Sequence, residues 1–167
     1  MFLSHFAARI SYGSAFFLIV VFSGLGSAAK LDSLSASQAM TPSSAQEGES
    51  IAKHFIMERL QVWQERLSLN DWKISIELVR REKLDPDTLG NVHWDTDNRQ
   101  GSIGVLSTRD YPTMPFGDML DDMELTVVHE LVHIHLASLP RSEASRGREE
   151  RAVDQLSRAL LKLAKSR

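Results

Sequence analysis

The sequence of 167 residues has no cysteine, no long hydrophobic run and no excess of basic residues. Without cysteine there is neither a disulfide nor a lipid-attachment site, so an exported domain would depend on its core or on a bound metal for stability. The 19 Lys and Arg and 22 Asp and Glu are interspersed, and the net charge is −3. Because no basic block appears, a nucleic-acid partner is not expected. The length suits one domain, and no internal repeat is present.

The N-terminus contains an apolar run that is too short to span a bilayer comfortably. It covers residues 15–22, whereas a spanning helix needs about 20 apolar residues. His5 and Arg9 precede the run without any acidic residue, and small residues follow it as far as Ala29. This order predicts an export signal in residues 1–29, cut after Ala28 or Ala29, and a periplasmic or secreted protein. If cleavage fails, residues 14–29 would instead anchor the chain to a membrane.

The rest of the chain divides into a polar linker and one domain. Residues 30–50 are rich in Ser, Ala, Gln and Thr, which is typical of a flexible linker, and the domain is expected over residues 51–167. Hydrophobic periodicity predicts helices at residues 47–69, 119–139 and 148–165, and strands at 72–78, 91–95 and 102–106. Strands followed by helices indicate an α+β domain with a small three-stranded sheet. The last two strands are expected to form a hairpin.

The strand at residues 102–106 has two alternative interpretations. It is short, with Gly101 directly before it and Gly104 within it. If this strand forms the edge of the sheet, its unpaired backbone groups would bind an extended peptide by strand addition. Otherwise it is an ordinary hairpin strand, and the sequence does not decide between the two.

The most informative motif is His129-Glu130-Leu131-Val132-His133 within the apolar helix at residues 119–139. Two histidines four positions apart lie on one face of a helix, where both imidazoles can bind one cation. The glutamate between them projects beside the metal and can take a proton from a water molecule. This pattern is the H-E-x-x-H signature of zinc metallopeptidases. Burying these polar side chains in an apolar helix would be costly without a metal.

A catalytic zinc needs a third protein ligand, and the final helix offers candidates. A third histidine in the pattern H-E-x-x-H-x-x-G-x-x-H is excluded because Leu136 and Leu139 occupy the required positions. Glu150 is favoured, since Asp154 follows one turn later and can hold the free ring nitrogen of a ligating histidine. Glu149 is the alternative third ligand, because it aligns with the apolar face of the helix.

The two motifs together resemble those of the gluzincin metallopeptidases. His129-Glu130-x-x-His133 is followed, after sixteen residues, by Glu150-x-x-x-Asp154, and the short connection is similar to that of the compact minigluzincins of bacteria and phages. The resemblance covers residues 72–163.

This resemblance implies a minimal zincin-like domain with one Zn²⁺ per chain that hydrolyses peptides or proteins. His129, His133 and Glu150 would bind the metal, Glu130 would act as the general base, and Asp154 would support a ligand. The alternative is an exported zinc-binding or interaction module without turnover. The large second domain of thermolysin-like enzymes is missing, which leaves an extended substrate cleft without sequence support.

Overall fold

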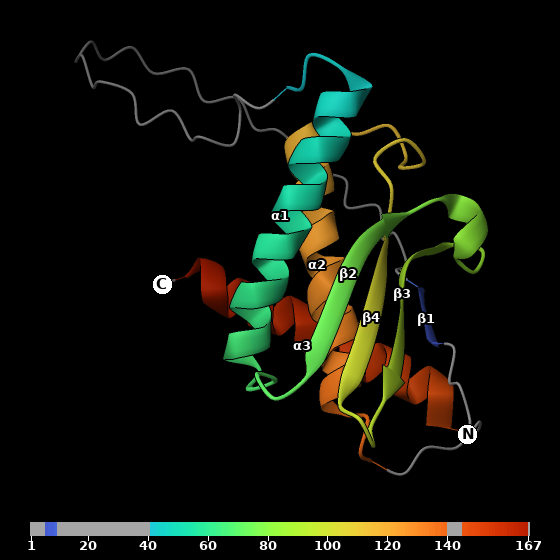
Figure 1. The fold of residues 1–167 in the computed structure, drawn as a ribbon, viewed down its shortest axis with the longest axis vertical. Helices are drawn as coiled ribbons and strands as arrows, with labels where there is room; N and C mark the ends of the chain where they lie inside the picture. The colour runs from blue at the N-terminus through green and yellow to red at the C-terminus, as the bar shows by residue number, and fades with distance from the viewer. Residues whose placement is uncertain (1–5, 10–40, 140–144, 167) are drawn as a thin grey trace, which may run out of the picture.

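The computed structural model describes residues 6–9, 41–139 and 145–166, which form an α+β fold with one mixed sheet and three long helices (Figure 1). This confirms the predicted fold class. The elements follow in the order β1 (Phe6–Arg9), α1 (Ala45–Arg66), β2 (Lys73–Val79), the short 3-10 helix η2 (Arg81–Lys83), β3 (Thr88–Asp95), β4 (Gln100–Leu106), α2 (Phe116–His135) and α3 (Arg146–Lys165).

The sheet has the strand order β1-β3-β4-β2. The predicted hairpin is confirmed, because β3 and β4 pair antiparallel, from Gly90 opposite Val105 to Asp95 opposite Gln100. The interpretation of β4 as the sheet edge was wrong. β2 pairs parallel with the other side of β4 along its whole length, so β4 is central. The central position suits its consecutive buried residues 103–106, since an edge strand would leave part of them exposed.

β1 extends the expected three-stranded sheet by a fourth strand. It pairs antiparallel with β3, placing Phe6 opposite Val92 and Arg9 opposite Thr88. It lies within the segment predicted as an export signal. The rest of that segment, the alternative anchor at residues 14–29 and linker residues 30–40 lie outside the described residues. Within the described ranges, no helix is both long and apolar enough to cross a membrane.

α1 begins at Ala45, so the last six residues of the expected linker, 45–50, are helical instead. The start is fixed by side-chain capping. The backbone N–H of Glu47 donates to Ser44 Oγ at 3.1 Å, and the backbone N–H of Ser43 donates to Glu47 Oε2 at 2.7 Å. These reciprocal bonds satisfy backbone donors that a helix start leaves without partners. The serine-rich composition that suggested a linker therefore supplies the helix cap.

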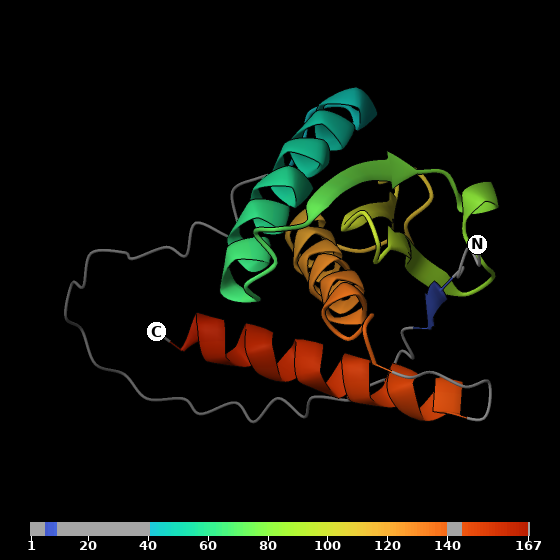
Figure 2. The ribbon, with the colours of Figure 1, turned by 60° about the horizontal axis from the view of Figure 1, so that its bottom comes forward.

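α1 and α2 pack on the same face of the sheet, with α3 beneath α2 (Figure 2). α2 is buried almost all round: from Met123 to Ile134, only Glu124 keeps appreciable exposure. Glu124 accepts a hydrogen bond from Trp63 Nε1 of α1 at 2.8 Å, which satisfies the indole of a buried tryptophan. The burial expected for the motif helix is confirmed, and the motif lies inside the core.

α3 buries a different face from the one that its periodicity predicts, which consists of Val153, Leu156, Leu160 and Leu163. Val153 is fully buried as expected, but Leu156 and Leu163 are 48% and 64% exposed. The helix packs instead through Val153, Ser157 and the half-buried residues Leu160, Leu161 and Ala164. Ser157 tolerates burial because its hydroxyl donates to the carbonyl of Val153 at 2.8 Å. The two stripes are neighbours on the helix, and periodicity alone did not separate them.

The loop between β4 and α2 is tied to the end of β2 by Asp110. Arg80 donates to its carboxylate at 2.6 and 3.0 Å, and the backbone N–H of Arg81 donates at 2.9 Å. The hydrogen bonds from Arg80, followed by that from Arg81, lower the pKa of Asp110. A carboxyl whose pKa is lowered by folding stabilises the protein above its unfolded pKa of about 3.9, and this contribution is lost as the pH falls through the folded pKa.

Replacing Asp110 with asparagine is therefore expected to lower the melting temperature at pH 7. The difference from the parent should shrink as the pH is brought below about 4, because the parent carboxyl then becomes protonated. Thermal unfolding of both proteins at several pH values measures this. Asp97→Asn, at an exposed position in the β3–β4 turn, is the matched control. A difference that stays constant with pH would contradict a charge-based role.

Candidate metal centre

The two histidines of α2 point their Nε2 atoms toward each other. His129 Nε2 and His133 Nε2 lie 3.1 Å apart, and both side chains are buried, with exposed fractions of 1% and 0%. One helical turn separates the residues, so the helix itself sets this spacing. The paired nitrogens form one side of a compact donor group.

α3 completes the group with Glu150. Glu150 Oε2 lies 3.4 Å from His129 Nε2, and Glu150 Oε1 lies 3.4 Å from His133 Nε2. The contact is fixed by Val153, which is fully buried one turn later, where α3 packs on α2. The ligand atoms of His129, His133 and Glu150 all lie within 4.8 Å of one another, so the group could hold a metal ion.

The donor set and its spacing fit a tetrahedral cation. Two ligand atoms about 2.1 Å from a tetrahedrally coordinated zinc lie about 3.4 Å apart. The closest distances between donor atoms here are 3.1, 3.4 and 3.4 Å. Buried side-chain oxygens that lack a hydrogen-bond partner within the described part of the chain include both of Glu150 and both of Glu130. Buried acceptors without donors are costly, and a cation bound by Glu150 would remove that cost for its two oxygens.

The protonation states of the group also suit a metal. Burial lowers the pKa of His133, outweighing the contacts with Glu150 that raise it. Burial opposes ionisation of Glu150, but its contacts with His129 and His133 prevail and lower its pKa to about 2. Metal ligation requires a neutral imidazole and an ionised carboxylate. At neutral pH the lowered pKa values of His133 and Glu150 favour these forms.

Glu130 lies beside the group and differs from Glu150 in its environment. Its side chain has no exposed surface. Burial, followed by the negative charge of Glu150, raises its pKa well above the ordinary value for a glutamate. A buried carboxyl group with a raised pKa beside a possible cation site is a candidate for proton transfer.

Gly90 of β3 is a further residue of the site, and sequence reasoning missed it. A Cβ at this position would lie 3.0 Å from Glu130 Oε1 and 2.5 Å from Thr126 Cγ2. Only glycine therefore lets β3 pass this close to the face of α2 that carries Thr126 and Glu130. The predicted strand began at residue 91, whereas β3 begins at Thr88, so Gly90 lay just outside the expected strand. A glycine within a strand often marks a close approach of the backbone to another group.

Glu149 and Glu150, the two candidates for the third ligand, contact different atoms of the histidines. Glu149 Oε1 lies 3.6 Å from His133 Nδ1, on the ring nitrogen that faces away from the donor group. Glu150 contacts the Nε2 atoms of both histidines. The geometry thus favours Glu150 over Glu149 as a member of the donor group, whereas Glu149 lies at ion-pair distance from the other ring nitrogen of His133.

Asp154 does not take the supporting position expected of it. Its carboxylate accepts from Arg158 Nε at 3.0 and 3.1 Å, an exposed pair one turn apart on α3. Among the described residues, none of its hydrogen bonds or ion pairs reaches a histidine. Asp154 thus pairs with Arg158 along the surface of the helix, and the acidic side chain nearest to the Nδ1 atom of His133 in these contacts is that of Glu149.

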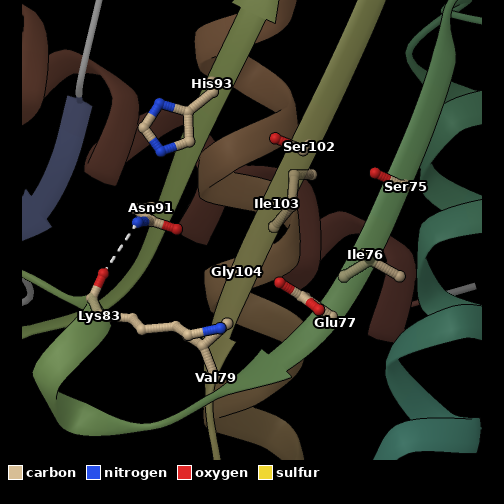
Figure 3. A pocket seen from close by; sticks show the side chains of 10 residues that line it. All are labelled: Ser75, Ile76, Glu77, Val79, Lys83, Asn91, His93, Ser102, Ile103 and Gly104. Carbon is tan, nitrogen blue, oxygen red and sulfur yellow. Dashed lines mark hydrogen bonds between the residues drawn. The ribbon is translucent and has the colours of Figure 1, made fainter.

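Peptide hydrolysis would also need a group that stabilises the oxyanion, and the sequence offers Tyr111, His93, His135 and Arg109 without favouring any of them. His135 and Arg109 are exposed, whereas Tyr111 is buried. His93 lines a hollow of about 320 Å³ on the outer face of the sheet, together with Asn91 and Ser102 (Figure 3). Gly90 faces α2, so side chains at odd positions of β3 point away from it. His93 therefore lies on the opposite side of the sheet from the metal group.

The histidines and glutamates of α2 and α3 are thus brought together by packing between two helices and one strand. Comparison of the chain with models of protein families, with curated proteins and with solved structures found no match in any of the three.

Proposed function

We propose that this chain is a zinc-dependent metallopeptidase with a minimal zincin-like fold. The observation that carries the proposal is the compact His129, His133 and Glu150 group with the buried carboxylate of Glu130 beside it. A purely structural metal site would not need a fourth side chain, the carboxyl group of Glu130, which is buried and has no hydrogen-bond partner among the described residues. The arrangement matches the division of labour in metal-assisted hydrolysis, with three ligands and a separate base.

Each residue has a distinct role in this proposal. His129, His133 and Glu150 would hold one Zn²⁺, which would lower the pKa of a water molecule to about 7 and polarise a carbonyl. Glu130 takes the proton from the water as it attacks the peptide carbonyl, and then delivers that proton to the departing nitrogen. Glu149 holds His133 in the required orientation through Nδ1. Gly90 lets β3 lie directly over Glu130.

The metal site is tested by the metal content of the purified full-length chain. We expect about one zinc per chain by elemental analysis, and we expect His129→Ala to lose it, because two remaining ligands bind zinc far more weakly. His135→Ala is the matched control, since His135 lies on the same helix but is exposed. Zinc should also raise the melting temperature of the parent and the control, by mass action on the folded state.

Two results would count against the proposal. If the parent and His129→Ala hold the same amount of zinc, the ion binds elsewhere. If neither protein binds zinc and a chelator leaves the melting temperature unchanged, the buried group is a set of core side chains. Binding without any peptide hydrolysis would instead favour a zinc-binding or interaction module.

A further inference from the structure

The metal centre is enclosed in this structure. His129, Glu130 and His133 have at most 1% of their surface exposed, and Glu150 keeps only 19% of its side-chain surface. A peptide bond must reach Glu130 and the metal ligands to be hydrolysed. Something that borders the site must therefore move or be removed before an extended substrate can enter.

β3 is the strand that borders the site. Gly90 lies above Glu130, and the side of β3 away from β4 would be the edge of the sheet if β1 were absent. A free strand edge offers alternating N–H and C=O groups to any extended chain, and the backbone alone provides the pairing. A peptide added along this edge would run past the catalytic glutamate.

That position is occupied by the chain itself. β1 pairs antiparallel with β3, with Ala7 opposite Asn91 and Arg9 opposite Thr88, and the register shifts between these two pairs, at the level of Gly90. Figures 1 and 2 both show β1 at the β3 edge, on the side where α3 begins. β1 also contacts α2. An incoming extended peptide would need the same backbone groups.

We infer that residues 6–9 act as an intramolecular occupant of the peptide-binding edge of β3, and that their displacement opens the metal centre. This inference rests on the proposed peptidase function and adds its regulation. A segment of the same chain pairs intramolecularly, so it competes with a free peptide at an effective concentration that does not depend on the protein concentration. If residues 1–29 are an export signal, as the sequence predicts, their cleavage would remove β1 and couple export to activation.

The absence of cysteine makes the strand pairing directly testable in the full-length chain. Ala7 and Asn91 are partners in the antiparallel ladder, and both kinds of antiparallel pair hold Cα atoms within the range a disulfide accepts. The double variant Ala7→Cys with Asn91→Cys should therefore form an intramolecular disulfide on mild oxidation. Ala7→Cys with Ser102→Cys is the control, because Ser102 lies one strand further away on β4. Equal cross-linking of both, or of neither, overturns the inference.

Access to the edge is measured with a fluorescent peptide that has the sequence of residues 4–11. The Glu130→Gln background prevents cleavage during the measurement. Two proteins are compared: oxidised Ala7→Cys/Asn91→Cys, in which β1 is fixed to β3, and Ala7→Pro/Ala8→Pro without cysteines, in which prolines remove the strand donors of β1. The oxidised protein should bind the peptide at least about 10-fold more weakly than the proline variant. Equal affinity would show that β1 does not compete for the edge.

The experiments distinguish an error in the proposed peptidase function from an error in the proposed role of β1. If the peptidase proposal is wrong, no protein hydrolyses peptide, yet the cross-link and the peptide competition still decide whether β1 occupies the edge. If hydrolysis occurs and the proline variant is no faster than the parent, the edge is not the route of entry. We expect the Ala7→Pro/Ala8→Pro variant to hydrolyse peptide about 10-fold faster than the parent.

Discussion

Replacing Glu130 with glutamine is expected to lower kcat for peptide hydrolysis by about 10³-fold, within the range that general bases contribute, while one zinc per chain remains bound. The reason lies in the separation of the proposed roles. Glu130 is buried beside the donor group, whereas His129, His133 and Glu150 are the described residues whose ligand atoms lie close enough together to hold a metal ion. Glutamine keeps the size of the side chain and loses only its ability to take the proton. Steady-state kinetics and elemental analysis measure the two effects separately.

Glu77→Gln is the matched control for this substitution. Glu77 is exposed on β2 and lines the hollow on the outer face of the sheet (Figure 3), so the same chemical change there should leave hydrolysis intact. If Glu130→Gln keeps full activity, the proposed base is wrong. If the variant binds zinc and the parent shows no hydrolysis at all, the metal has a structural role and the non-catalytic alternative is correct.

Replacing Gly90 with alanine is expected to have the second largest effect, because it acts on the fold and the site together. The new methyl group would lie 2.5 Å from Thr126 Cγ2, 3.0 Å from Glu130 Oε1 and 3.0 Å from the Gly104 carbonyl. Overpacking of this kind typically costs about 1–3 kcal/mol. β3 or α2 must shift, and Glu130 moves with them. We expect a lower free energy of unfolding and a loss of most hydrolytic activity.

Two further variants separate crowding from a general effect of alanine. Gly147→Ala is the control, because no atom lies within 4 Å of a Cβ built at that position of α3. Adding Thr126→Ser to Gly90→Ala removes the closest clashing methyl group and should recover part of the stability. Chemical denaturation measures all four proteins. If Gly90→Ala unfolds at the same denaturant concentration as the parent, the close approach of β3 to α2 is not required.

The fold class and the motif helix could be predicted from the sequence because both depend on local patterns. The apolar positions of residues 119–139 identify a buried helix, and the spacing of His129 and His133 fixes their shared face. The interpretation of Glu150 also used a local rule, namely a second carboxylate one turn later. The structure gives Glu150 the expected place near the histidines but pairs Asp154 with Arg158.

The remaining features depend on contacts between distant segments. The order of strands in the sheet follows from the parallel pairing of β2 with β4, and nothing within residues 102–106 indicates that partner. β1 was missed because Phe6–Arg9 lies beside an apolar run that dominates the pattern. The role of Gly90 becomes visible only when Thr126 and Glu130 of another element are placed against it.

Few residues of α3 are fully buried, and this affects how the protein would respond to loss of a metal. Only Val153 and Ser157 of this helix are fully buried, while Leu156 and Leu163 remain in contact with solvent. A cation shared by Glu150 and the two histidines would join α3 to the core across the interface between the helices. Metal binding and docking of α3 then form one linked equilibrium, in which local unfolding of the C-terminal helix competes with ligation. Removal of the metal should therefore loosen the C-terminal helix that would supply the third ligand.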